Sequence, residues 1–129
     1  MEEDSVLLGH ARNPYSRIDT LKSTRLVTVT ARGRKLAETR GAVLLYETGH
    51  VVRPYIDRGD VDMALLRPSD TRTVCPYKGV AKYFSATIDG QAVKDIAWFY
   101  DDPMPEVAMI KDRLAFYPER VDALTIAAK

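Results

Sequence analysis

Apolar and polar side chains alternate along the first half of the chain in the way that strands with one buried face require. Residues 26–30 are mostly β-branched and alternate roughly, and residues 35–38 resume the pattern after Arg32-Gly33-Arg34. Because glycine favours tight turns, these segments predict a hairpin whose basic tip lies in solvent.

The next stretch predicts a second hairpin and a short helical segment. The apolar run 42–47 and the returning segment 51–56 can pair, and Pro54 favours an edge or bulged strand because proline donates no backbone hydrogen bond. Residues 60–66 begin with an aspartate that can cap a helix and carry apolar side chains at helical spacing, before Pro68 stops the helix. One or two helical turns are therefore expected.

Three further strands are predicted at 71–75, 81–88 and 93–100, and the dipeptide Asp89-Gly90 joins the last two. Asp-Gly is a strong signal for a two-residue hairpin turn, so this is the best-determined local feature of the chain.

The end of the chain predicts one more helix and the closing strands. Two prolines preset the first turn of a helix over 103–111, and Val107 and Ile110 share one face of it. Residues 114–117 and 121–126 predict one or two final strands.

Short strands joined by hairpin turns, with no long helix crossing between parallel strands, predict a mainly β fold. We expect a single compact antiparallel β domain of folded sheets over residues 25–129, with one or two short helices. Residues 1–24 have no sustained periodicity and are expected to form an arm packed on this domain. No glycine-rich phosphate-binding motif is present.

The composition fits one folded domain and names no charged partner. A chain of 129 residues, 46% apolar and 29% charged, can bury one core without a metal or disulfides. Nineteen basic and eighteen acidic residues give a net charge of +1, so no global field attracts a nucleic acid or an anionic membrane. Neither is expected as a partner.

Cysteine and histidine usage argues against a metal centre. Cys75 is the only cysteine, and His10 and His50 form no metal-ligand spacing with it, so we expect no disulfide, no metal and no other cofactor. The chain starts with acidic residues and has neither a basic signal-peptide start nor an eighteen-residue apolar span. We therefore expect a cytoplasmic location.

The segment Cys75-Pro76-Tyr77-Lys78-Gly79 interrupts the strand pattern with a proline and ends in glycine, so the backbone must bend there. The bend presents an amine on Lys78 and a phenol on Tyr77. Taken alone, it is better explained as a tight turn between strands with an exposed lysine than as a site.

Together with its surroundings, this segment resembles domain-of-unknown-function family 427. The resemblance is carried by residues 73–83, 97–103 and 114–117, which read TVCPYKGVAKY, AWFYDDP and LAFY, in this order and spacing. Upstream, the N-terminal half of the same family resembles residues 13–19 and 47–49, with Arg53, Tyr55 and Asp60-Val61. The match covers roughly residues 10–124, and the combined signature is specific.

The resemblance implies a compact domain similar to the β-tent group, which includes zinc-binding chaperone-like and cereblon-type ligand-binding modules. This chain lacks the cysteine pairs that hold zinc in those relatives. A nucleotidyltransferase-like label is also attached to the family, but no paired carboxylates in a Gly-Ser context are present to hold two magnesium ions. Pro54 stands where a second aromatic residue often sits in the family, which predicts an altered pocket wall.

The resemblance also implies that the shared polar and aromatic residues line one cavity, and their composition is that of a ligand site. The catalytic candidates are Lys78, Glu47 and Tyr83, and the ligand-binding candidates are Arg53, Tyr55, Tyr77, Trp98 and Tyr100. Lys78 can act as a base, a Schiff-base amine or an oxyanion stabiliser, while Glu47 can move a proton.

These candidates also have structural interpretations. Trp98 on an apolar strand is more often a core residue, and Glu47 and Arg53 can form an ion pair across a hairpin. Cys75 is favoured as a small buried hydrophobe, and His50 is expected in a loop.

Two functions remain open. We prefer a small-molecule-binding domain in which aromatic residues enclose a ligand that Lys78, Arg53 and Glu47 orient. The alternative is a cofactor-free enzyme of isomerase, cyclase or lyase type, which uses Lys78, Glu47 and a tyrosine for acid–base chemistry on a carbonyl-containing metabolite. Exposed strand edges also keep a homodimer open.

Overall fold

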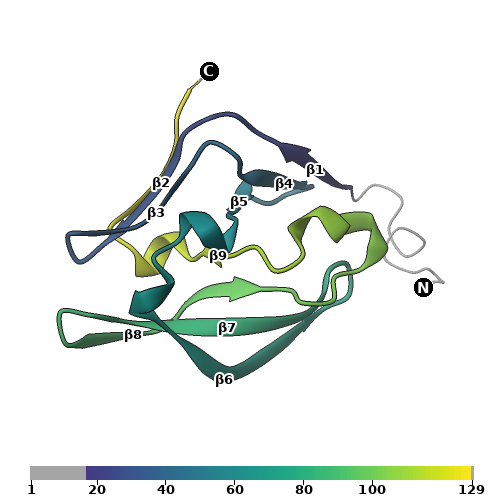
Figure 1. Cartoon of the computed structure of the whole chain (residues 1–129). Helices are drawn as coiled ribbons and strands as arrows, with labels where there is room; N and C mark the ends of the chain where they lie inside the picture. Colours follow the sequence, from purple (N-terminus) through teal and green to yellow (C-terminus); the bar gives the residue numbers. More distant parts are fainter. Residues whose placement is uncertain (1–16, 129) are drawn as a thin grey trace.

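Three antiparallel sheets make up the part of the chain that the computed structural model describes, residues 17–128 (Figure 1). The first sheet has the order β1 (Ile18–Lys22), β4 (Val43–Glu47), β5 (Arg53–Tyr55). The second has the order β10 (Ala123–Ile126), β2 (Val27–Ala31), β3 (Arg34–Thr39). The third has the order β6 (Leu66–Cys75), β7 (Gly79–Ile88), β8 (Gln91–Phe99), β9 (Ala115–Phe116).

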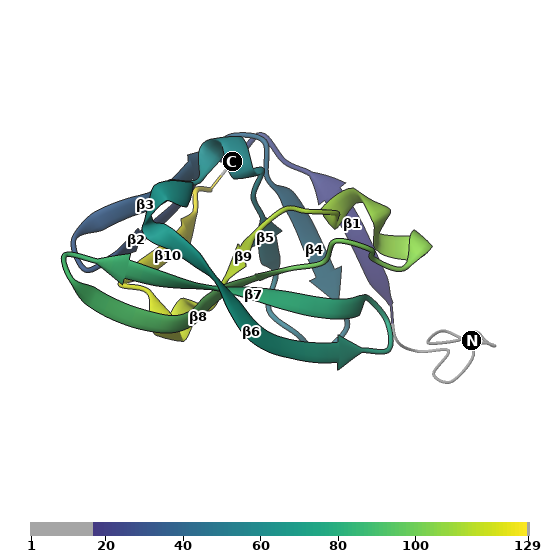
Figure 2. The same cartoon turned by 60° about the horizontal axis from the view of Figure 1, so that its bottom comes forward.

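The two smaller sheets lean toward each other above the larger one. In Figure 1 they form the upper left and upper right slopes, and β6, β7 and β8 form the base. Figure 2 brings the base forward and shows β7 and β8 running across both smaller sheets. The expected mainly β fold of folded antiparallel sheets is confirmed.

The turns predicted from sequence are present. The β2–β3 turn has positive φ at Arg32 (50°) and Gly33 (75°), and the β7–β8 turn has positive φ at Asp89 (51°) and Gly90 (80°). Two consecutive positive φ angles match the twist of an antiparallel hairpin, which explains the glycine in the second position of each turn.

The second predicted hairpin is also confirmed, as β4 and β5. Pro54 is in β5, an edge strand of its sheet, and lies opposite Leu44 of β4. An edge strand tolerates proline because the side that lacks the N–H can face solvent, where no neighbouring strand needs that hydrogen bond. The wall that carries Arg53 and Tyr55 is therefore a short strand at the border of a sheet.

The helical segments are short 3₁₀ helices. Two of them lie where the sequence predicts one or two helical turns. These are η1 (Arg58–Asp60) and η2 (Met63–Leu65), and the cap is Asp57, whose side chain accepts a hydrogen bond from the Gly59 N–H. Pro68 does not mark the end of a helix, because it already lies in the edge strand β6, next to a shift in register. The expected cap at position 60 is therefore wrong.

The segment predicted as a helix over 103–111 contains η3 (Pro105–Ile110), a 3₁₀ segment that is kinked at Val107 (φ −123°, ψ 29°). Val107 and Ile110, expected to share one face, are both buried. A further turn, η4 (Pro118–Arg120), precedes β10. Within residues 17–128, no helix has the length and apolar character needed to cross a membrane.

Residues 18–22, which we assigned to an arm packed on the domain, form β1 and pair with β4. Residues 1–16 of the expected arm lie outside the described residues.

The base sheet takes part in two hydrophobic clusters. One packs Phe84 and Ile88 against side chains from β2 and β3, such as Val29. The other packs Trp98 and other aromatic residues of the base against β4 and β5, including Tyr55. The second cluster contains four of the eight predicted site residues: Tyr55, Tyr83, Trp98 and Tyr100.

Candidate functional site

Strand register gathers aromatic residues on one face of the base sheet. Tyr83 of β7 lies opposite Trp98 of β8, and Trp98 lies opposite Ala115 of β9. Side chains two residues apart share a face of a strand, so Tyr100 and Tyr117 extend this row beyond the ends of β8 and β9. The face is thus aromatic because of its register.

The facing wall comes from the β4–β5 hairpin. Leu45 of β4 lies opposite Arg53 of β5. Glu47 comes two residues after Leu45, and Tyr55 comes two residues after Arg53. The same alternation therefore turns these four side chains toward the base sheet, and all four line the cavity described next.

A cavity of ≈ 300 Å³ lies between these two walls. Its lining consists of Leu45, Glu47, His50, Arg53, Tyr55, Cys75, Lys78, Tyr83, Trp98, Tyr100 and Tyr117. Seven of the eight site residues predicted from sequence are in this set, and the eighth, Tyr77, is half-buried and is not part of the lining.

Lys78 and Glu47 form an ion pair at the cavity. Lys78 Nζ donates to Glu47 Oε1 over 2.8 Å, and the two side chains are 13% and 18% exposed. His50 Nε2 lies 3.9 Å from the other carboxylate oxygen of Glu47, so a protonated imidazole adds a second cation there. The predicted alternative, an ion pair of Glu47 with Arg53, is wrong because Glu47 pairs with Lys78.

The loop between β6 and β7 holds Lys78 in this position. Lys78 N–H donates to the Cys75 carbonyl over 3.2 Å, and the Lys78 carbonyl accepts from the Met104 N–H over 2.9 Å. Gly79 has a φ of +119°, and a Cβ there would lie 3.2 Å from the Asp102 carbonyl oxygen. The loop therefore needs glycine both for its backbone conformation and for the close approach of residues 102–104.

Trp98 is fixed at the centre of the aromatic wall. Its Nε1–H donates to the Tyr55 hydroxyl over 3.1 Å, and the two rings meet edge to face. Its centroid lies 4.4 Å from that of Tyr117. Burial raises the pKa of Tyr55 well above its ordinary value of 10.0, so this phenol stays neutral.

The Tyr83 hydroxyl already has partners on two sides. It shares a hydrogen bond of 2.8 Å with Thr73 Oγ1 and accepts from the Tyr117 hydroxyl over 3.3 Å. Burial, together with this contact to Tyr83, raises the pKa of Tyr117 to about 12. Among residues 17–128, neither Lys78 nor Glu47 has a tyrosine hydroxyl within hydrogen-bond reach.

Tyr100 differs from the other tyrosines of the lining. It is only 4% exposed, yet its hydroxyl has no hydrogen-bond partner in the part of the chain that the structure describes. Burial and the neighbouring Tyr55 and Cys75 raise the pKa of Tyr100 far above 10.0. Within the described residues, the cavity is therefore lined by a neutral phenol that donates to no other group.

Arg53 provides a second cation on the opposite wall. Its guanidinium carbon lies 5.5 Å from the centroid of Trp98, which is a cation–π contact. No carboxylate within the described residues lies within 4.0 Å of the guanidinium. The aromatic contact holds Arg53 in place without neutralising its charge.

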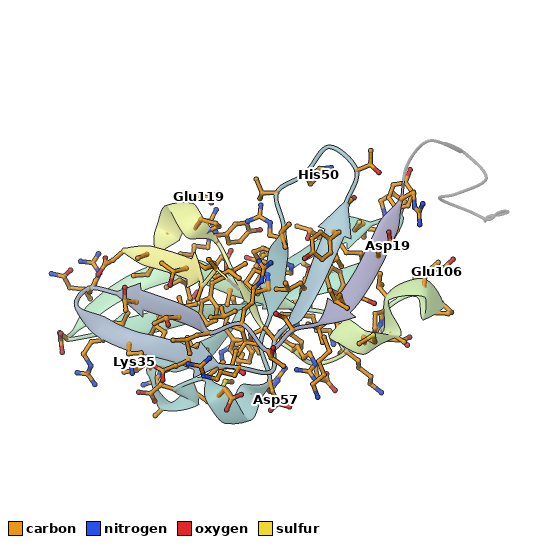
Figure 3. The ribbon with its side chains drawn as sticks, turned by 90° about the horizontal axis from the view of Figure 1, so that it is seen from above. Asp19, Lys35, His50, Asp57, Glu106 and Glu119 are labelled. Atoms are coloured by element: carbon orange, nitrogen blue, oxygen red, sulfur yellow. The ribbon has the colours of Figure 1, made fainter. Side chains whose placement is uncertain are left out.

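Three polar or reactive lining residues were not among the predicted site residues: His50, Cys75 and Tyr117. Figure 3 shows His50 on the loop between β4 and β5, where it projects beyond the sheets, as expected for a loop residue. Cys75 is half-buried and lines the cavity. Tyr117 is the last residue of the LAFY motif at 114–117, and that motif was the feature of the sequence from which it could have been predicted as a site residue.

The described residues contain no group of three or more His, Cys, Asp or Glu side chains that could hold a metal ion. What the cavity offers is hydrogen-bond donors, one carboxylate and aromatic faces. It can enclose a small molecule, and the Lys78–Glu47 pair can move a proton.

Comparison with known proteins agrees with the motifs. The family model described as "Domain of unknown function (DUF427)" matches residues 19–127, which confirms the resemblance carried by residues 73–83, 97–103 and 114–117. No curated protein matches the chain.

Proposed function

The chain belongs to the DUF427 family, and we propose that this domain binds a small molecule in the cavity between the β4–β5 hairpin and the base sheet. The observation that carries the proposal is the lining of that cavity, which combines an aromatic wall with charged groups that are mostly withdrawn from water.

The size and chemistry of the cavity support this function. Its volume of ≈ 300 Å³ is at the lower end of the range for ligand pockets, so the ligand is small. Trp98 and Tyr117 provide flat apolar surface, while Lys78, Glu47 and Arg53 provide the few polar contacts that fix orientation. Ligand sites typically combine a mainly apolar lining with a few such groups.

Aromatic residues in a core do not by themselves require a ligand, because they also stabilise the fold. The charges are the stronger argument. Burying a lysine and a glutamate together has a desolvation penalty that a well-packed apolar pair avoids. A binding role gives these two residues a reason to be at the cavity.

The alternative function, a cofactor-free enzyme of isomerase, cyclase or lyase type, is favoured by one observation. The Lys78–Glu47 pair, at 2.8 Å, can give and take a proton next to a bound carbonyl compound. The predicted third member, Tyr83, has its hydroxyl engaged by Thr73 and Tyr117. We therefore prefer binding.

Trp98 offers a direct test because it is the only tryptophan in the chain and lines the cavity. A library of small planar metabolites is screened for compounds that change the emission of Trp98 and raise the melting temperature. A ligand that binds only the folded protein must raise its stability. The proposal fails if no compound changes either quantity.

Two variants locate the binding. Lys78→Ala is expected to abolish the response to a hit while the protein stays folded. Lys35→Ala is the matched control, because Lys35 forms an ion pair with Glu38 that is exposed and lies away from His50 in Figure 3. Binding that is unchanged in Lys78→Ala contradicts the proposed site. Product formation from a hit, lost in Glu47→Gln, favours the enzyme instead.

A further inference from the structure

The charges that line the cavity do not cancel among the described residues. Lys78 and Glu47 neutralise each other at 2.8 Å. Arg53 has only the face of Trp98 as a partner in this part of the chain. With His50 neutral, the described lining therefore has an excess of one positive charge, which lies on the β5 wall, and a protonated His50 adds a second.

The hydrogen-bonding capacity left in the cavity is mainly that of donors. Trp98 Nε1–H and the Tyr83 hydroxyl are already engaged. Arg53 has five N–H groups, and Lys78 has two N–H groups beyond the one given to Glu47. Tyr100 also lines the cavity, and its hydroxyl has no partner within residues 17–128. A ligand that fits must supply acceptors.

The aromatic wall limits the shape of the ligand. The Trp98 and Tyr117 rings lie with their centroids 4.4 Å apart and their planes tilted by 47°, and each has an arginine over it, Arg53 over Trp98 and Arg120 over Tyr117. A flat ring or conjugated chain packs against such a surface with little loss of freedom, and a carboxylate attached to it can reach a guanidinium at the edge.

We propose that the ligand is a small planar monocarboxylate, whose carboxylate pairs with Arg53 and whose flat body lies against Trp98 and Tyr117. This inference rests on the proposed function. When His50 is neutral, Arg53 is the one unneutralised cation of the described lining and matches one negative charge, which favours a monocarboxylate over a phosphate dianion. A cationic ligand would find Glu47 already paired with Lys78 and would meet the charge of Arg53.

The test compares three probes of nearly equal size: benzoate, benzamide and benzylamine. Each is titrated into the full-length protein, and both Trp98 emission and the melting temperature are recorded. Benzoate is expected to bind at least about tenfold more tightly than benzamide, which corresponds to about 1.4 kcal/mol. Benzylamine is expected to bind more weakly still. This comparison needs no variant.

Variants then test whether Arg53 causes the preference for benzoate over benzamide. Arg53→Gln is expected to bind benzoate and benzamide equally, and Arg53→Lys, which keeps the charge, is expected to retain a preference for benzoate. Arg34→Gln is the matched control, since Arg34 forms an exposed ion pair with Asp89 and neither residue lines the cavity. A benzoate preference that persists in folded Arg53→Gln overturns the role of Arg53.

The outcomes separate this inference from the proposed function. If benzamide or benzylamine changes Trp98 emission at least as readily as benzoate, the carboxylate inference is overturned while binding at the cavity stands. If none of the three probes has an effect at millimolar concentration, the carboxylate inference also fails. The broader library screen then decides the proposed function independently.

Discussion

Lys78 Nζ donates to Glu47 Oε1 over 2.8 Å and so ties the β6–β7 loop to the end of β4. These residues are 31 positions apart in the sequence, and the elements they join belong to different sheets. The ion pair is therefore a structural link across the cavity.

Removing one partner of this pair is expected to destabilise the fold. Lys78→Met leaves the Glu47 carboxylate mostly buried without its donor, and the free energy of unfolding should fall by about 1.5–3 kcal/mol. Urea denaturation measures the change. The exposed pair is the control: Lys35→Ala should lower the free energy of unfolding by less than about 1 kcal/mol.

A double variant distinguishes an unpaired charge from lost packing. Glu47→Gln combined with Lys78→Met removes both charges and should restore part of the stability lost in Lys78→Met, because no charge is left unpaired. If the two single effects simply add, the coupling inferred from the 2.8 Å contact is contradicted.

Tyr55 is expected to stabilise the core through its hydroxyl. In Tyr55→Phe the buried Trp98 Nε1–H loses its acceptor, so the free energy of unfolding should fall by about 1–3 kcal/mol. Tyr46→Phe provides the control, since Tyr46 is 37% exposed and lies outside the cavity lining. Equal stability of the two variants would show that the hydrogen bond contributes nothing.

Gly79 is expected to tolerate alanine less well than Gly90 does. Both have positive φ, but only at Gly79 would a Cβ meet backbone, at 3.2 Å from the Asp102 carbonyl oxygen. Backbone strain alone costs roughly 1–3 kcal/mol, and Gly79→Ala adds this contact to it. Urea denaturation of Gly79→Ala and Gly90→Ala compares them, and a smaller loss in Gly79→Ala contradicts the close approach.

The hairpins could be predicted from sequence because their signals are local. Asp89-Gly90 determines the turn between β7 and β8 by its own backbone preferences, and Pro54 marks an edge strand because it lacks an N–H. β1 depends instead on a partner: Ile18 to Lys22 form a strand because β4 supplies the hydrogen bonds across a gap of some twenty residues. No pattern within those five residues shows this.

The cavity could be predicted only in part. The resemblance to a family brought Glu47, Arg53 and Lys78 together as candidates, but the choice of ion pair depends on where the β6–β7 loop lies. That position is determined by the Met104 contact and by Gly79, neither of which sequence spacing encodes. Tyr77, next to Lys78 in the sequence, does not line the cavity.

The buried tyrosines predict a loss of stability in alkali. Burial raises the pKa of Tyr55 and Tyr100 above 10.0 and that of Tyr117 to about 12, so above pH 10 the folded protein keeps protons that the unfolded chain releases. The stability that these protons provide is present in full below about pH 10 and falls as the pH rises further. Urea midpoints measured on both sides of that pH should show the decline.

Tyr100→Phe isolates one of these phenols. The variant has no ionisable group at position 100, so its stability should decline less steeply above about pH 10 than that of the natural sequence. Near neutral pH the loss should be small, because the hydroxyl has no partner among residues 17–128. A decline as steep in Tyr100→Phe as in the natural sequence would mean that Tyr100 ionises equally in both states, and the inferred burial of its hydroxyl would be wrong.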